Sequence, residues 1–171
     1  AKTRVQANVT LGQVSGYMND PYKVAELDGV LVPESRPDSK TKTILYVSAI
    51  RYLQLLKASL EGSYRWYNDD FGITGHTFSL AWFQQFGERL TIRPRVRFYS
   101  QNAADFYAVR FSGSPEFYSS DYRVSALETV SYGVKAIWQP SERVALDVGV
   151  DRYEQEGKDD VTSAVLYPAA D

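Results

Sequence analysis

Apolar and polar residues alternate along much of the chain, which is the pattern of β-strands whose two faces meet different surroundings. The segment 90–101 shows it most clearly. Its apolar face carries Leu90, Ile92, Val96 and Phe98, and its polar face carries Arg93, Arg95 and Arg97. Pro94, on the apolar side, removes a hydrogen-bond donor from the ladder and therefore predicts a bulge or a local break in strand pairing.

Seven segments carry enough of this alternation to predict strands. They are residues 4–14, 43–53, 60–67, 76–86, 90–101, 128–138 and 144–155. The alternation is weak in 43–53, and we assign no faces to that strand. Helical periodicity is absent outside one short stretch, so the sequence predicts an all-β protein.

The connections between the predicted strands alternate in length. The long or intermediate ones are 16–40, 68–75 and 102–127, and another begins at 156–160; the short ones are 55–58, 86–89 and 139–143. Alternate connections of an antiparallel sheet lie at opposite ends, so the long ones share one end. This arrangement is typical of outer-membrane barrels, with short periplasmic turns and long extracellular loops, and it places the amino terminus in the periplasm.

The pattern thus predicts an antiparallel up-and-down transmembrane β-barrel. Strands of about 10–12 residues suit a tilted membrane span better than the usual globular sheet. The predicted number of strands, seven, is odd, whereas bacterial single-chain barrels have an even number of strands. In addition, residues 167–171 lack the terminal aromatic strand of such barrels. We therefore expect residues 1–171 to be one β-barrel region with about seven or eight strands, incomplete at both ends and part of a larger barrel.

Composition narrows the class of protein further. The 24 aromatic residues (13 Tyr, 8 Phe and 3 Trp) include several near strand ends, as in the girdles at membrane interfaces. A net charge of −2 offers no global field for nucleic acid. The chain has no cysteine for a disulfide framework or a thiolate metal site, and no apolar run reaches the about 18–20 residues of a transmembrane helix.

Charged residues on the polar faces are the first candidate site. They are Glu61, Arg65, Arg93, Arg95, Arg97, Lys135, Asp147 and Asp151. An arginine facing lipid costs about 2–4 kcal/mol, so we expect all of them to line a lumen. Two interpretations stand: an anion-attracting conduit, or a structural network in which the three carboxylates neutralise the cations of a filled barrel.

Acidic and turn-forming residues at the proposed extracellular end are the second candidate site. The loop residues are Asp20, Pro21, Tyr22, Arg36, Asp38, Asp69, Asp70, Asp105 and Asp121. Carboxylates are suitable Ca²⁺ ligands, but no segment has the spacing of a known calcium loop, and turn chemistry accounts for Asp equally well. We predict neither a metal site nor a cofactor.

The single histidine, His76, is the third candidate because it lies near Asp69, Asp70 and Ser79. His76 and Ser79 are three positions apart in the predicted strand, so their side chains point to opposite faces of the sheet. This is poor geometry for a nucleophile and its base. The chain also lacks a phosphate-binding glycine loop, a zinc motif and a nucleic-acid module. We therefore predict a protein that is not an enzyme and binds no nucleic acid.

Several motifs resemble a family of bacterial outer-membrane β-barrels of unassigned function. They are Gly16–Lys23, Glu34–Ser39, Tyr64–Asp70, Gly75–Thr77, Tyr99–Tyr107 and Ser120–Arg123. The resemblance extends from Gly16 to about Gly157. The resemblance implies an outer-membrane location and a larger barrel, and it supplies no catalytic residues. Members resemble components encoded near extracytoplasmic redox and flavin-attachment proteins. The resemblance therefore suggests a link to redox processes of the cell envelope.

These observations predict a non-enzymatic barrel in the bacterial outer membrane, surrounded by its lipid. It would act as a passive conduit for small solutes or as a scaffold for envelope proteins. The alternative is a soluble periplasmic β-barrel that binds an apolar ligand and uses its aromatic residues as an ordinary core. Partition with detergent separates the two.

Overall fold

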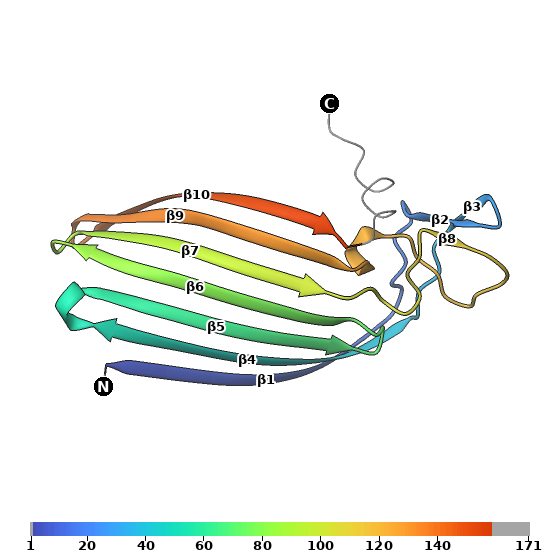
Figure 1. Cartoon of the computed structure of the whole chain (residues 1–171), viewed down its shortest axis with the longest axis horizontal. Coiled ribbons are helices and arrows are strands. Elements are labelled where there is room, and N and C mark those ends of the chain that lie inside the picture. Colours follow the sequence, from blue (N-terminus) through green and yellow to red (C-terminus); the bar gives the residue numbers. More distant parts are fainter. Residues whose placement is uncertain (1, 159–171) are drawn as a thin grey trace, which may run out of the picture.

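The computed structural model describes residues 2–158, and one antiparallel sheet dominates it (Figure 1). Its strands are β1 (Thr3–Ser15), β4 (Ser39–Leu53), β5 (Ala58–Asp69), β6 (Thr74–Phe86), β7 (Leu90–Gln101), β9 (Leu127–Ser141) and β10 (Val144–Gly157). They lie in the order β1-β4-β5-β6-β7-β9-β10. The predictions of an all-β fold and of seven antiparallel strands are confirmed.

The sheet is open within residues 2–158, because β1 and β10 each pair with a single neighbour. Its two longest connections share one end as predicted, but residues 70–73, predicted within an intermediate connection, number four, as few as the turn 54–57. Residues 16–38, 70–73 and 102–126 connect strands at one end, here the loop end, and residues 54–57, 87–89 and 142–143 at the other, the turn end. The predicted absence of a closing strand at 167–171, and most of the connection predicted to start at 156–160, lie outside the described residues.

A second, smaller sheet lies at the loop end and was not predicted (Figure 1). Its strands are β2 (Val24–Leu27), β3 (Val30–Pro33) and β8 (Arg110–Phe111), in the order β3-β2-β8. Asp28 and Gly29 turn the β2–β3 hairpin with φ values of 49° and 81°. Asp-Gly is a strong signal for such a turn, but strands of four and two residues are too short to show alternation.

Helical structure in the described part of the chain is limited to the 3₁₀ turns η1 (Gln54–Leu56) and η2 (Tyr122–Val124). No helix there is long and apolar enough to cross a membrane.

Strand register divides the side chains of the large sheet into two faces. We call the face that carries Arg95 the polar face and the other the apolar face. Arg95 lies opposite Ala81 on β6 and Gly133 on β9, and the rows continue across the sheet with the same parity except at the turn end of β9 and β10, where the register shifts between Val144 and Leu146. On β4, Ile44 and Ile50 lie on the polar face, which explains why the alternation in that segment is weak.

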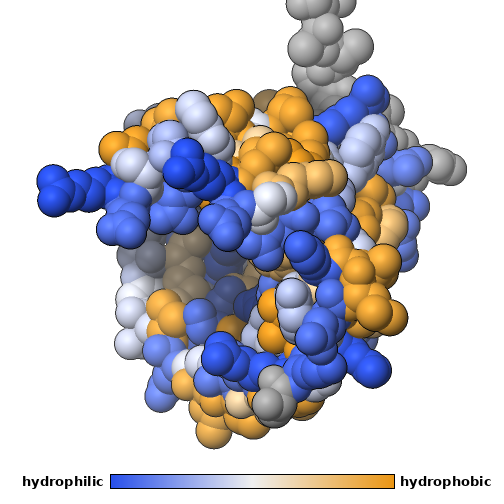
Figure 2. All heavy atoms as spheres, turned by 90° about the vertical axis from the view of Figure 1, so that its left-hand side faces the viewer, coloured by the Kyte–Doolittle hydropathy of each residue, from blue (hydrophilic) through white to orange (hydrophobic). Residues whose placement is uncertain are grey.

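Burial is reversed relative to a soluble sheet. On β6 the polar-face residues Thr77 and Ala81 are 6% and 7% exposed, whereas the apolar-face residues Phe78 and Leu80 are 55% and 49% exposed. Seen from the turn end, apolar side chains lie around the periphery and hydrophilic ones gather about a hollow (Figure 2). A separate apolar core lies at the loop end and contains Phe71, Ile73, Ala104 and Val124.

Pro94 breaks the pairing of β6 and β7 locally. Trp82 and Phe83, across from it on β6, are unpaired with β7, and pairing resumes at Gln84 and Ile92 in the same register. The break is therefore an interruption of the ladder without an inserted residue, consistent with the missing proline N–H.

Candidate functional site

All eight charged residues proposed for the first site lie on the polar face. Four of them form ion pairs. Arg95 binds Asp151 in a two-pronged geometry, with Nε to Oδ1 at 2.9 Å and Nη2 to Oδ2 at 2.7 Å. Lys135 pairs with Asp147. The structural-network interpretation thus accounts for two cations.

The Arg95–Asp151 pair spans a strand, because β9 lies between β7 and β10. Gly133 is the β9 residue between them in register. A Cβ on Gly133 would come within 2.2 Å of Asp151 Oδ1 and 2.3 Å of the Val150 carbonyl oxygen. The absence of a side chain at this position therefore allows the guanidinium to reach the carboxylate.

The other three arginines form no ion pair among residues 2–158. Arg65 lies over the Tyr67 ring at 5.5 Å and Arg93 over the Phe83 ring at 4.7 Å. Arg97 has neither kind of contact in the described part of the chain. Of the three carboxylates in the structural-network interpretation, Asp147 and Asp151 form ion pairs, and Glu61 forms none among residues 2–158.

The polar face carries several hollows, and two of them contain most of the candidate residues. The middle hollow, of about 280 Å³, is lined by Glu61, Ser63, Ser79, Leu80, Ala81, Arg93, Arg95, Val96, Arg97 and Ser131. The second, of about 590 Å³, lies between the sheet and the loops, and its walls include Arg36, Lys40, Arg65, Tyr99 and Arg123. The loops therefore stand over one end of the polar face rather than apart from it.

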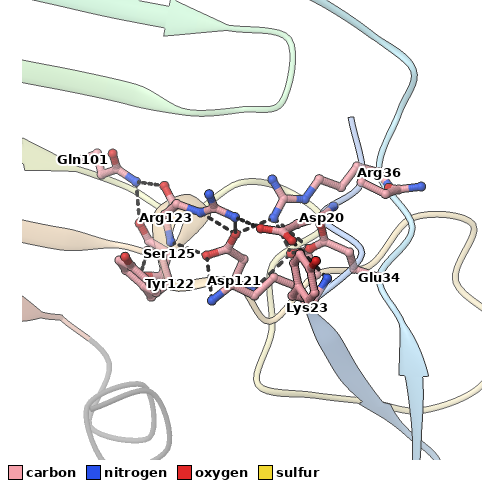
Figure 3. Close-up of polar contacts among 12 residues, drawn as sticks. Asp20, Lys23, Glu34, Arg36, Gln101, Asp121, Tyr122, Arg123 and Ser125 are labelled. Atoms are coloured by element: carbon pink, nitrogen blue, oxygen red, sulfur yellow. Dashed lines mark hydrogen bonds and ion pairs between the residues drawn. The ribbon is translucent and has the colours of Figure 1, made fainter. Parts of the chain in front are cut away.

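A network of charged and polar side chains, partly buried, joins the loops, and we call it the loop cluster (Figure 3). Its members are Asp20, Lys23, Glu34, Arg36, Ser119, Asp121 and Arg123. Arg36 Nη2 donates to Glu34 Oε2 and to Asp121 Oδ2, both at 2.7 Å. Asp121 and Ser119 are completely buried, and Glu34 is 4% exposed.

Arg123 completes the loop cluster from the other side of Asp121 (Figure 3). Its Nε donates to Asp121 Oδ2 at 2.7 Å and its Nη2 to Asp20 Oδ2 at 2.6 Å. Burial raises the pKa of Asp121, but hydrogen bonds from Arg123 and Arg36 outweigh it, so the pKa lies below its ordinary value. The pKa of Asp20 is lowered by the Tyr22 backbone N–H and by Arg123.

Asp69 organises the turn between β5 and β6. Its Oδ1 accepts hydrogen bonds from the backbone N–H groups of Phe71 and Ile73, and its Oδ2 accepts one from the Tyr67 hydroxyl at 2.6 Å. Lys40 lies 3.6 Å from the same carboxylate. Asp69 is therefore a structural anchor between the loop end and the polar face.

The remaining loop residues proposed from the sequence lie outside the loop cluster. Asp70 Oδ2 accepts from the Thr41 backbone N–H at 2.9 Å, and Asp105 N donates to the Phe71 carbonyl at 2.9 Å. Asp38 is exposed, Tyr22 is 91% exposed, and Pro21 lines the hollow under the loops.

Sequence reasoning missed Glu34, Ser119 and Arg123 as site residues, although their neighbours were named. The signal was present in the arginines at 36 and 123, each beside acidic loop residues. Within residues 2–158 no group of three or more His, Asp or Glu side chains is placed to hold a metal ion. Asp20, Glu34 and Asp121 bind arginines, whereas Asp69 and Asp70 accept hydrogen bonds from backbone N–H groups.

His76 lies on the apolar face, opposite Trp66 in register. Its Nδ1 is 2.8 Å from the Tyr64 hydroxyl, and the two rings stack with centroids 6.1 Å apart. Ser79 lies on the polar face, so the predicted opposite parity of His76 and Ser79 is confirmed.

Comparison with known proteins identifies the family of this chain, and the function of that family is unknown. No curated protein and no solved structure matches it. A family profile matches residues 1–169, nearly the whole chain. The chain therefore belongs to the family described as "Protein of unknown function (DUF3570)".

Proposed function

We propose that this chain forms part of the wall of an outer-membrane β-barrel that acts as a non-enzymatic conduit for small solutes. The observation that carries the proposal is the reversed burial of the large sheet. In the middle of the sheet its apolar face is the exposed one, with Phe78 and Phe98 55% and 50% exposed, whereas Thr77 and Thr129 of the polar face are 6% and 9% exposed. In water such a face requires a second layer, which the described residues do not contain, whereas lipid satisfies it directly.

Strand length supports the same proposal. The seven strands have 12 to 15 residues, more than the about 9–11 that a tilted strand needs to cross the hydrocarbon core. Aromatic residues of the apolar face lie toward both ends of the strands, Trp66 near the loop end and Phe86 and Trp138 near the turn end. Barrels carry aromatic girdles at these two levels.

The polar face supplies the lining that a conduit requires. Its cations exceed its carboxylates: the cations are Arg4, Lys40, Lys42, Arg65, Arg93, Arg95, Arg97 and Lys135, and the carboxylates are Glu61, Asp69, Asp147 and Asp151. Water in a lumen stabilises such groups, and the surplus favours anions. On this proposal the loop cluster narrows the extracellular mouth.

The test is to express the protein fused to an export signal in a Gram-negative host and to run isolated outer membranes on gels, boiled and unboiled. A folded barrel migrates differently before and after boiling, and it partitions with detergent. A protein that remains in the aqueous phase and shows no shift on boiling would refute the proposal and favour a soluble β-protein that binds an apolar ligand.

A scaffold for envelope proteins is the second candidate. The observation that favours it is the exposed apolar surface of the small sheet at the loop end, where Val30 and Leu31 of β3 are 61% and 69% exposed and the preceding Tyr22 is 91% exposed. Conductance of the purified protein in planar bilayers separates the two functions. Steps of ion current support the conduit, and a folded but silent barrel supports the scaffold.

A further inference from the structure

The middle hollow contains a row of hydroxyl and guanidinium groups. Ser63, Ser79, Arg97 and Ser131 are paired in register across β5, β6, β7 and β9. In the adjacent row, Ala81 and Gly133 flank Arg95. Because these neighbours are small, Arg97 is the only long side chain of its row on these four strands, and about 280 Å³ of space is left around it.

Apart from Arg95, the serine hydroxyls and guanidinium groups of this hollow have no hydrogen bond or ion pair to a side chain of residues 2–158. No hydrogen bond joins the three serine hydroxyls, or the Arg97 guanidinium, to another described residue. Arg93 Nε is buried and has no acceptor. Arginine stays charged at any physiological pH, so the buried Arg93 Nε requires an acceptor from outside the described residues, and the exposed Arg97 guanidinium is open to the same acceptor.

The charges of the hollow favour an anion. Arg93 and Arg97 have no ion pair among residues 2–158, whereas Asp151 occupies Arg95. Glu61 is the one carboxylate in the lining, and it pairs with none of the three arginines. The hollow therefore has two unneutralised cations against one carboxylate.

We infer that the middle hollow binds a small dissolved oxyanion such as phosphate or sulfate. Guanidinium groups match the oxygens of such an anion with paired N–H donors, and the serine hydroxyls add neutral donors. An uncharged solute would leave the cations unpaired. The inference rests on the proposed function, in which this face lines a water-filled lumen, and it names the class of solute that the lumen retains.

The test is titration calorimetry of inorganic phosphate into the full-length protein in detergent, at constant ionic strength. Arg97→Gln should weaken binding at least about tenfold, because a charge-assisted contact is lost. Lys135→Gln is the matched control: it removes one positive charge from the same face outside the hollow and should change affinity by less than about threefold. Glu61→Gln should act in the opposite direction and tighten binding.

Binding and folding are read separately in the same samples. A wild-type protein that shifts on boiling but binds no phosphate would overturn the anion site and leave the proposed barrel standing. Equal losses in Arg97→Gln and Lys135→Gln would also overturn it, since the general charge of the face would then suffice. A protein without a shift on boiling refutes the barrel itself. A parallel titration with dihexanoyl phosphatidate tests whether the bound phosphate group belongs to a lipid headgroup. Binding of this lipid without binding of inorganic phosphate would overturn the inference that the ligand is a dissolved anion.

Discussion

At the scale of single residues, Gly133 allows an ion pair to form across it because it has no side chain. Arg95 and Asp151 lie on strands that do not touch, and the guanidinium passes over the strand between them at this glycine. Two-pronged arginine–carboxylate contacts are among the stronger ion pairs, and this one links β7 to the edge strand β10.

Gly133→Ala should destabilise the protein by about 1–3 kcal/mol, because the added Cβ collides with the β10 backbone as well as with Asp151. Urea unfolding of the full-length protein in lipid vesicles measures the change. Gly149→Ala on β10 is the control, since its Cβ would meet Lys135 Cβ at an ordinary 3.6 Å. Equal effects of the two substitutions would contradict the proposed collision.

Asp121 is the residue on which the loop cluster depends, because both Arg36 and Arg123 donate to its Oδ2. Asp121→Asn should destabilise the loops by about 3 kcal/mol, since two arginines lose a buried counter-charge. Limited proteolysis should then cut within residues 102–126 while the strands stay intact. Asp38→Asn, at an exposed loop position, is the control and should leave the cleavage pattern unchanged.

At the scale of elements, each long strand presents two chemically distinct faces. On β1, Asn8 lies opposite Tyr46 on the polar face and Val9 lies opposite Leu45 on the apolar face, both in the middle of the strand. Both residues are exposed, so neither substitution is limited by packing within the chain.

Val9→Arg should reduce stability by about 2–4 kcal/mol and lower the amount of assembled barrel, because it places a charge against lipid. Asn8→Arg adds the same side chain to the polar face and should assemble normally. The ratio of shifted to unshifted protein on gels measures both. If the two variants assemble equally well, the apolar face does not meet lipid.

At the scale of the whole molecule, the sheet and the loop end are held by different interactions. Backbone ladders join the seven long strands, and they do not titrate. The loops depend on carboxylates of the loop cluster. The two parts should therefore respond differently to acid.

The loops should loosen before the sheet as pH falls. The pKa values of Asp20 and Asp121 are lowered in the folded state, so their contribution to stability is full above the ordinary carboxyl pKa near 3.8 and is lost as pH falls through the lowered values. Hydrogen exchange, corrected for the intrinsic rate, should show lost protection in residues 102–126 below about pH 3.8. Protection there that is the same at pH 2 and pH 6 would contradict this coupling.

Much of the large sheet could be predicted because strand alternation is a local property. Residues 90–101 were predicted with the bounds of β7, and the two faces of that strand are those expected from parity. The faces of β4 could not be predicted, since isoleucines lie on its polar face and only the register with β5 identifies that face. The β2–β3 hairpin was missed because four-residue strands show too little alternation.

The sequence by itself determined the seven long strands, the two faces of all of them except β4, and the end at which the long connections lie, because each follows from a period of two residues and from chain direction. Tertiary structure alone decided which charges meet. Arg36 and Asp121 lie 85 residues apart in the chain, and Arg95 and Asp151 lie 56 apart. Such partners depend on loop folding and on the register of strands that are not neighbours, and no local pattern records either.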